Sequence, residues 1–100
     1  MLASFLESIA NQDGRIALIT GANSGLGLET ARILLEKDAT VILCCRSKNN
    51  GLKAREDLIR ETGSDKVELI KIDLADLSEV ERVGKEIIDR YRRLDILINN

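Results

Sequence analysis

The sequence predicts an α/β fold in which a parallel β-sheet is flanked by helices and stops after its fourth strand. Short apolar runs alternate along the chain with segments whose apolar residues recur every three or four positions. Right-handed crossovers turn the order strand, helix, strand, helix, strand, helix, strand into a parallel sheet. No repeat or low-complexity segment interrupts the alternation. We therefore expect one domain over residues 15–100, preceded by an extension over 1–14.

Four apolar runs have the length and composition of strands that are covered on both faces. They lie at Ile16–Ile19, Val41–Cys45, Val67–Ile72 and Ile96–Ile98. Cys44 and Cys45 are neighbours in the second run, and neighbouring side chains of a strand point to opposite faces. We therefore expect no disulfide and no shared metal ion, and we interpret both cysteines as buried strand residues.

Three segments between these runs have helical periodicity. Their expected apolar positions are, in chain order, Leu28, Ala31, Leu34 and Leu35, then Leu52, Leu58 and Ile59, then Leu77, Val80, Val83, Ile87, Ile88 and Tyr91. Gly63 is placed to end the middle helix. Ser78 and Glu81 have the spacing of a capping box at the start of the third helix.

Composition excludes several classes of protein. The chain has 15 Lys and Arg against 17 Asp and Glu, so it offers no basic field for nucleic acid. Phe5 and Tyr91 are the only aromatic residues, too few to stack on bases. The sequence has no histidine, which excludes histidine base catalysis and histidine-ligated metal sites. We expect no nucleic-acid partner and no metal site.

The first ten residues predict neither a secretory signal nor a membrane span. They lack a basic segment and contain Glu7, and no apolar run approaches the roughly 20 residues of a transmembrane helix. Leu2, Phe5, Leu6 and Ile9 fall on one helical stripe. This stripe predicts a short helix over the domain or a frayed extension, with contact to a membrane surface as the alternative. The expected location is cytoplasmic, with membrane-surface association left open.

The segment Thr20–Gly27 joins the first predicted strand to the first predicted helix and contains Gly21, Gly25 and Gly27. A strand that turns sharply into a helix while its backbone touches a pyrophosphate needs residues without a Cβ at those places. The helix that follows directs its unpaired amides and the positive end of its dipole at the anion. The segment therefore predicts a phosphate-binding loop in a Rossmann-type fold.

The pattern T-G-x-x-x-G-x-G in this loop resembles the signature of the short-chain dehydrogenase/reductase family. Its spacing differs from the fingerprint G-x-G-x-x-G, and no Gly-Lys-Ser/Thr of a P-loop follows. The resemblance extends over residues 15–100. The loop together with the L-C-C-R-S strand end is similar to the retinol-dehydrogenase-like and protochlorophyllide-reductase-like branches of the family.

The resemblance implies a set of cofactor-binding residues. The loop would contribute Gly21, Asn23, Ser24, Gly25, Leu26 and Gly27. Asp73, followed by Leu74, matches the acidic residue that contacts the adenine ring in the family, and its alternative is a solvated strand-end carboxylate. Asn99 and Asn100 match the opening of the family's N-N-A-G motif, which braces strands beside the cofactor. Their alternative is a simple role in ending the strand.

The end of the second strand favours NADP(H) over NAD(H). A carboxylate there would accept hydrogen bonds from the ribose 2′-hydroxyl and repel a 2′-phosphate. This chain has Cys45 at that place, followed by Arg46 and Ser47. A guanidinium can bind the phosphate through two charge-assisted hydrogen bonds. Asn23, Ser24 and Lys48 are further candidates for the same phosphate, and the alternative for Arg46 is an ordinary surface residue.

The family's catalytic Tyr-x-x-x-Lys pair has no counterpart in these 100 residues. Tyr91 is the only tyrosine, and position 95, where the lysine would stand, is Asp95. Tyr91 also falls on the apolar face of its helix, so packing accounts for it. We assign no catalytic residue and expect the chain alone to be inactive.

The resemblance implies the cofactor-binding half of an oxidoreductase that transfers hydride between a nicotinamide and a carbonyl or alcohol substrate. We expect a substrate to bind only in a complete chain and interpret this chain as a fragment of a longer polypeptide. Its fourth strand would then be a bare edge that invites self-association. The alternatives are a non-catalytic dinucleotide-binding or interaction module and an S-adenosylmethionine-dependent methyltransferase. Arg46 argues against the methyltransferase, which would need an acidic partner for the ribose.

Overall fold

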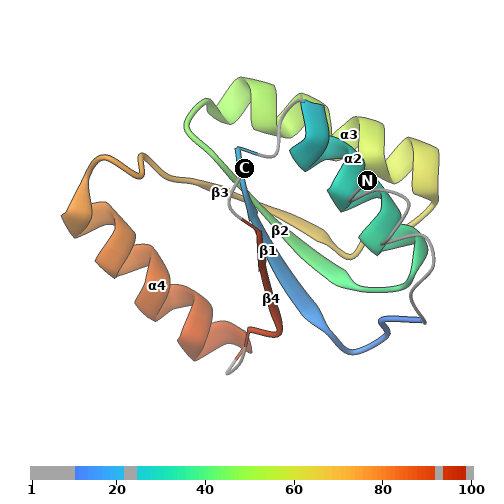
Figure 1. Ribbon diagram of the computed structural model, residues 1–100. Helices are drawn as coiled ribbons and strands as arrows, with labels where there is room; N and C mark the ends of the chain where they lie inside the picture. Colours follow the sequence, from blue (N-terminus) through green and yellow to red (C-terminus); the bar gives the residue numbers. More distant parts are fainter. Residues whose placement is uncertain (1–10, 22–24, 92–93, 99–100) are drawn as a thin grey trace.

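The computed structural model describes residues 11–21, 25–91 and 94–98 of the chain. Within these residues the elements follow the predicted order (Figure 1). They are β1 (Ile16–Thr20), α2 (Gly25–Glu36), β2 (Thr40–Cys45), α3 (Lys48–Thr62), β3 (Val67–Lys71), α4 (Leu77–Tyr91) and β4 (Ile96–Ile98). The predicted stripe of Leu2, Phe5, Leu6 and Ile9 lies outside the described residues.

The four strands form one parallel sheet in the order β3-β2-β1-β4. α2 and α3 cover one face of the sheet and α4 covers the other (Figure 1). The step from β3 across to β4 reverses the direction in which successive strands are added, and parallel sheets bind ligands at such a point. This arrangement confirms the predicted fold class.

The larger part of the core lies between the sheet and the α2 and α3 helices. β2 contributes Val41 and Leu43, and both side chains are fully buried. Leu34 of α2 and Leu58 of α3 pack against the same face of the sheet. The predicted end of α3 is confirmed: Gly63 has a φ of 74°, and its amide donates a hydrogen bond of 2.9 Å to the Ile59 carbonyl.

A smaller cluster lies between the sheet and α4. Ile42 and Cys44 of β2 belong to this cluster, whereas Cys45 belongs to the cluster on the opposite face. Both cysteines are free and buried. Because they belong to clusters on opposite sides of the sheet, the prediction that they point to opposite faces is confirmed. Val83 and Ile87 are the buried residues that α4 contributes to this cluster.

Three details of the predicted helices are wrong. The capping box of Ser78 and Glu81 is not formed, because Asp76 caps α4 through hydrogen bonds from the Ser78 and Glu79 amides to Oδ1 at 3.0 and 3.3 Å. Leu52 is 40% exposed, and Gly51 is the neighbour that is buried. On α4 the predicted apolar face is too wide, because Leu77 and Ile88 are 81% and 66% exposed.

β4 is the least covered strand of the sheet. It pairs with β1 on one side, and in the described part of the chain no strand lies on its other side. Leu97 in its centre is 59% exposed. The predicted bare edge is therefore present.

The neighbours Ile87 and Ile88 provide a test of this packing. Ile87→Ala should lower the free energy of unfolding by about 2–5 kcal/mol, because it leaves a cavity between α4 and the sheet. Ile88→Ala, at the exposed position one residue along, should change it by no more than about 0.5 kcal/mol. Urea titrations followed by circular dichroism measure both. Equal losses would show that α4 does not pack on the sheet through Ile87.

Candidate functional site at the carboxyl ends of the strands

At the two described ends of the connection from β1 to α2, the backbone has the geometry that the glycine pattern predicts. Gly21 and Gly25 have φ values of 60° and 61°, in the left-handed region that residues with a Cβ rarely adopt. A Cβ on Gly25 would meet nothing within 4 Å, so conformation rather than space requires glycine there. Gly27 is buried in the first turn of α2 itself. Asn23 and Ser24, predicted to belong to the same loop, lie outside the described residues.

The start of α2 can accept an anion. Amides of the first turn of a helix have no partner within the helix, and they point outward with the positive end of the dipole. The first turn of α2 carries no acidic side chain that would repel an anion. The Gly21 amide is not among the free donors, because it donates to the Cys44 carbonyl at 3.1 Å. This hydrogen bond ties the start of the loop to the end of β2.

A hollow of about 310 Å³ lies beside this loop. It is lined by Gly21, Cys44, Arg46, Ile72, Asp73, Leu74 and Ala75, which come from the ends of β1, β2 and β3. The structure thus brings together four of the predicted site residues, namely Gly21, Arg46, Asp73 and Leu74. The other described site residues do not line it, namely Gly25, Leu26, Gly27 and Ser47. Asn99 and Asn100 lie outside the described residues.

The sequence did not single out Cys44, Ile72 or Ala75 as lining residues. Cys44 and Ile72 pack together on the α4 side of the sheet, so their contribution depends on the register between β2 and β3. The available signal was the alternation along β2, which places Cys44 and Cys45 on different faces. Burial raises the pKa of the Cys44 thiol to about 11, so the thiol stays neutral and contributes surface rather than charge.

The Asp73 carboxylate is held by the turn that follows β3. Its Oδ1 accepts a hydrogen bond of 3.0 Å from the Ala75 amide, and its own amide donates to Glu79 Oε1 at 3.3 Å. These bonds orient a half-buried carboxylate at the edge of the hollow. The other carboxylate oxygen, Oδ2, is the acceptor that remains for a ligand.

Arg46 is exposed where β2 ends, and none of the ion pairs among the described residues involves it. The next residue, Ser47, caps α3: its Oγ accepts a hydrogen bond of 3.2 Å from the Asn50 amide. Cys45, immediately before Arg46, is buried against the α3 side of the sheet. The end of β2 therefore presents a cation and no carboxylate.

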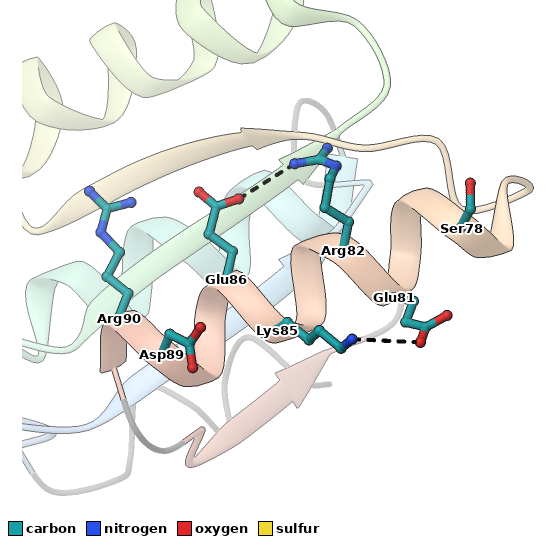
Figure 2. A pocket seen from close by; sticks show the side chains of 7 residues that line it. All are labelled: Ser78, Glu81, Arg82, Lys85, Glu86, Asp89 and Arg90. Carbon is teal, nitrogen blue, oxygen red and sulfur yellow. Dashed lines mark ion pairs between the residues drawn. The ribbon is translucent and has the colours of Figure 1, made fainter.

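A larger depression follows the outer face of α4 (Figure 2). Its residues come from one helix and pair along it, Arg82 with Glu86 at 3.6 Å and Lys85 with Glu81 at 4.0 Å. Exposed i,i+4 ion pairs are typical of a solvated helix surface and contribute little energy. None of the predicted site residues lies there. The hollow at the strand ends is therefore the candidate site.

The contacts of Tyr91 indicate a structural role rather than a catalytic one. Its hydroxyl donates a hydrogen bond to the Glu68 carboxylate, which also pairs with Arg90 at 3.0 Å. Burial, and then the bond to Glu68, raises the pKa of Tyr91 to about 12.

The described part of the chain holds no group of three His, Cys, Asp or Glu residues that could bind a metal. None of its helices is long and apolar enough to cross a membrane.

A parallel α/β sheet with a glycine loop between its first strand and the following helix defines a nucleotide-binding unit of the Rossmann type. The family model for short chain dehydrogenases matches residues 15–100, and the chain belongs to this family.

Individual relatives agree with the family. Dehydrogenase/reductase SDR family member 13 of Bos taurus is 42% identical over 92 residues, which are 92% of this chain and 24% of that protein. Retinol dehydrogenase 11 of Mus musculus is 38% identical over 87 residues, or 87% of this chain and 28% of that protein. The predicted similarity to retinol dehydrogenases is thus confirmed.

A solved structure has the same fold over most of the chain. The RhlG/NADP active-site complex of Pseudomonas aeruginosa superposes with a TM-score of 0.79 at 33% identity. The match covers 90% of this chain and 35% of that one. The chain therefore spans about a quarter to a third of the length of these proteins.

Tyr91→Phe tests the structural interpretation of this tyrosine. Loss of its hydrogen bond to Glu68 should lower the free energy of unfolding by about 0.5–1.5 kcal/mol. Dinucleotide affinity should stay the same, because Tyr91 does not line the hollow. Thermal unfolding and a fluorescence titration with NADPH measure the two effects. A variant with unchanged stability and weakened NADPH binding would contradict this interpretation.

Proposed function

We propose that this chain binds NADP(H) in the hollow at the carboxyl ends of β1, β2 and β3. One observation carries the proposal: Gly21, Arg46 and Asp73 come from three separate strand ends and line a single hollow. In a complete enzyme this unit would hold the cofactor while hydride moves between its nicotinamide and a carbonyl or alcohol substrate.

Each part of the dinucleotide has a matching group. The adenine ring would lie against the apolar surfaces of Ile72, Leu74 and Ala75, and Asp73 Oδ2 would accept a hydrogen bond from its exocyclic amine. The diphosphate would lie at the start of α2, where backbone amides supply the donors. Asn23, Ser24, Asn99 and Asn100 belong to the proposed binding residues on the family resemblance alone.

The charge at the end of β2 supports NADP(H) over NAD(H). A ribose 2′-phosphate would meet the guanidinium of Arg46, which forms no ion pair with any described residue, and Ser47 and Lys48 follow it in the sequence. Cys45 contributes no carboxylate to repel that phosphate or to bind a 2′-hydroxyl. The similar RhlG structure is a complex with NADP, which agrees with this preference.

The chemical step needs residues that these 100 do not include. A tyrosine that transfers a proton to or from the substrate oxygen needs a nearby cation to lower its pKa. The pKa of Tyr91 is instead raised, and its hydroxyl is engaged with Glu68. We therefore propose that the chain by itself binds the cofactor without turnover.

Arg46→Ala tests the cofactor assignment. Loss of charge-assisted hydrogen bonds worth about 1.5–3 kcal/mol should weaken NADPH binding about 10- to 100-fold and leave NADH binding nearly unchanged. Cys45→Asp combined with Arg46→Ile should shift the preference from NADP(H) toward NAD(H). Arg82→Ala, on the exposed face of α4, is the matched control. Isothermal titration with both cofactors measures the affinities, and an unchanged NADPH to NADH ratio in Arg46→Ala would refute the assignment.

Gly25→Ala tests the phosphate loop. Gly14 provides the control, because its φ is 81° and a Cβ there also meets nothing within 4 Å. Both Ala variants should lose about 1–2 kcal/mol of stability through the left-handed backbone. Only Gly25→Ala should also weaken NADPH binding, by about tenfold or more, because it changes the start of α2. If both variants bind NADPH equally well, the diphosphate does not lie at this helix.

A further inference from the structure

The first turn of α3 lies unusually close to the sheet at Gly51. A Cβ built on this residue would be 2.5 Å and 3.1 Å from the two methyl carbons of Leu69 on β3. It would also be 3.3 Å from the Cβ of Cys45 on β2. Contacts below 3.0 Å require atoms to move, so a side chain at position 51 would displace either the methyl groups of Leu69 or the first turn of α3.

Space is the reason for glycine at this position. Gly51 is not among the residues with positive φ, so its backbone is one that any residue adopts. Glycine inside a helix costs about 0.5–1 kcal/mol relative to alanine, so helix formation does not favour it either. By contrast Gly84, in the interior of α4, has open space at its Cβ position.

The close approach lies next to the residues that the proposed 2′-phosphate site uses. The Gly51 amide donates to the Ser47 carbonyl at 3.0 Å, and the Ser47 side chain accepts from Asn50 in the same turn. In the sequence Arg46 lies between Ser47, which caps this turn, and Cys45, whose Cβ lies beneath Gly51. Any shift of the turn away from β2 would therefore move Ser47 directly and Arg46 with it.

We infer that Gly51 is a positioning residue for NADP(H) selectivity. By letting α3 rest on Cys45 and Leu69, it holds Arg46 and Ser47 where they reach the 2′-phosphate of the cofactor. The inference rests on the proposed function and adds to it a residue that touches no ligand. Both the NADPH and NADH complexes use the diphosphate and adenine contacts, so a shift of this turn changes their relative affinity.

The test compares Gly51→Val with Gly84→Val. The added carbon of alanine meets Leu69 first, whereas a branched side chain also crowds the Cβ of Cys45, which is attached to the backbone, so valine should move the turn more than alanine does. Gly51→Val should reduce the ratio of NADPH to NADH affinity about tenfold, and Gly51→Ala less, because a displacement of about 1 Å is enough to lose a directed contact. Gly84→Val should leave the ratio unchanged.

Rescue separates positioning from a general loss of structure. Leu69→Ala removes the atoms nearest to the added Cβ, so Gly51→Ala combined with Leu69→Ala should regain the wild-type ratio despite its lower stability. Leu69→Ala alone should leave the ratio as in the wild type. If Gly51→Val does not fold, Gly51→Ala and its rescue decide the question. An unchanged ratio in Gly51→Ala, or a reduced ratio that the second substitution does not restore, overturns the inference.

The same titrations distinguish this inference from the proposed function. Wild-type protein that does not prefer NADPH, or a preference that survives Arg46→Ala, refutes the proposed function and the positioning role with it. Wild-type preference that depends on Arg46 but not on Gly51 refutes the positioning role alone.

Discussion

The hydrogen bond between the Gly21 amide and the Cys44 carbonyl connects the sheet to the site. It continues the ladder between β1 and β2 by one residue beyond the last strand pair, Thr20 with Cys44. The loop therefore leaves the sheet from a fixed point, where the backbone of Gly21 is left-handed. The hollow forms only if β1, β2 and β3 end side by side at this edge of the sheet, because its lining residues lie at or just after the ends of these three strands.

Burial on both faces of the sheet fixes the register of the strands and therefore aligns their carboxyl ends. β2 has five consecutive buried residues, whose side chains alternate between the α2–α3 cluster and the α4 cluster. A slip of one residue in the pairing would exchange these faces and place every side chain of the strand in the wrong cluster. The packing that stabilises the protein thus also places Arg46 and Asp73 at neighbouring strand ends.

Several features of the fold and site could be predicted from the sequence because they depend on local interactions. The positions of the strands follow from the period of apolar residues. The end of α3 at Gly63 and the need for glycine at Gly21 and Gly25 follow from backbone preferences. The width of the α4 apolar face was overestimated, since periodicity shows which residues share a face but not how much of it a neighbour covers. The cap at Asp76 was missed because two acceptors with suitable spacing compete at the same helix start.

The sequence by itself determined the order of the elements, the glycine loop and the absence of a carboxylate at the end of β2. Each of these is a property of residues that are close together in the chain. Only the tertiary structure decided that Cys44, Ile72 and Ala75 complete the hollow and that Gly51 lies against Cys45 and Leu69. Those contacts join residues of separate elements, and the distance between two elements depends on all the side chains packed between them.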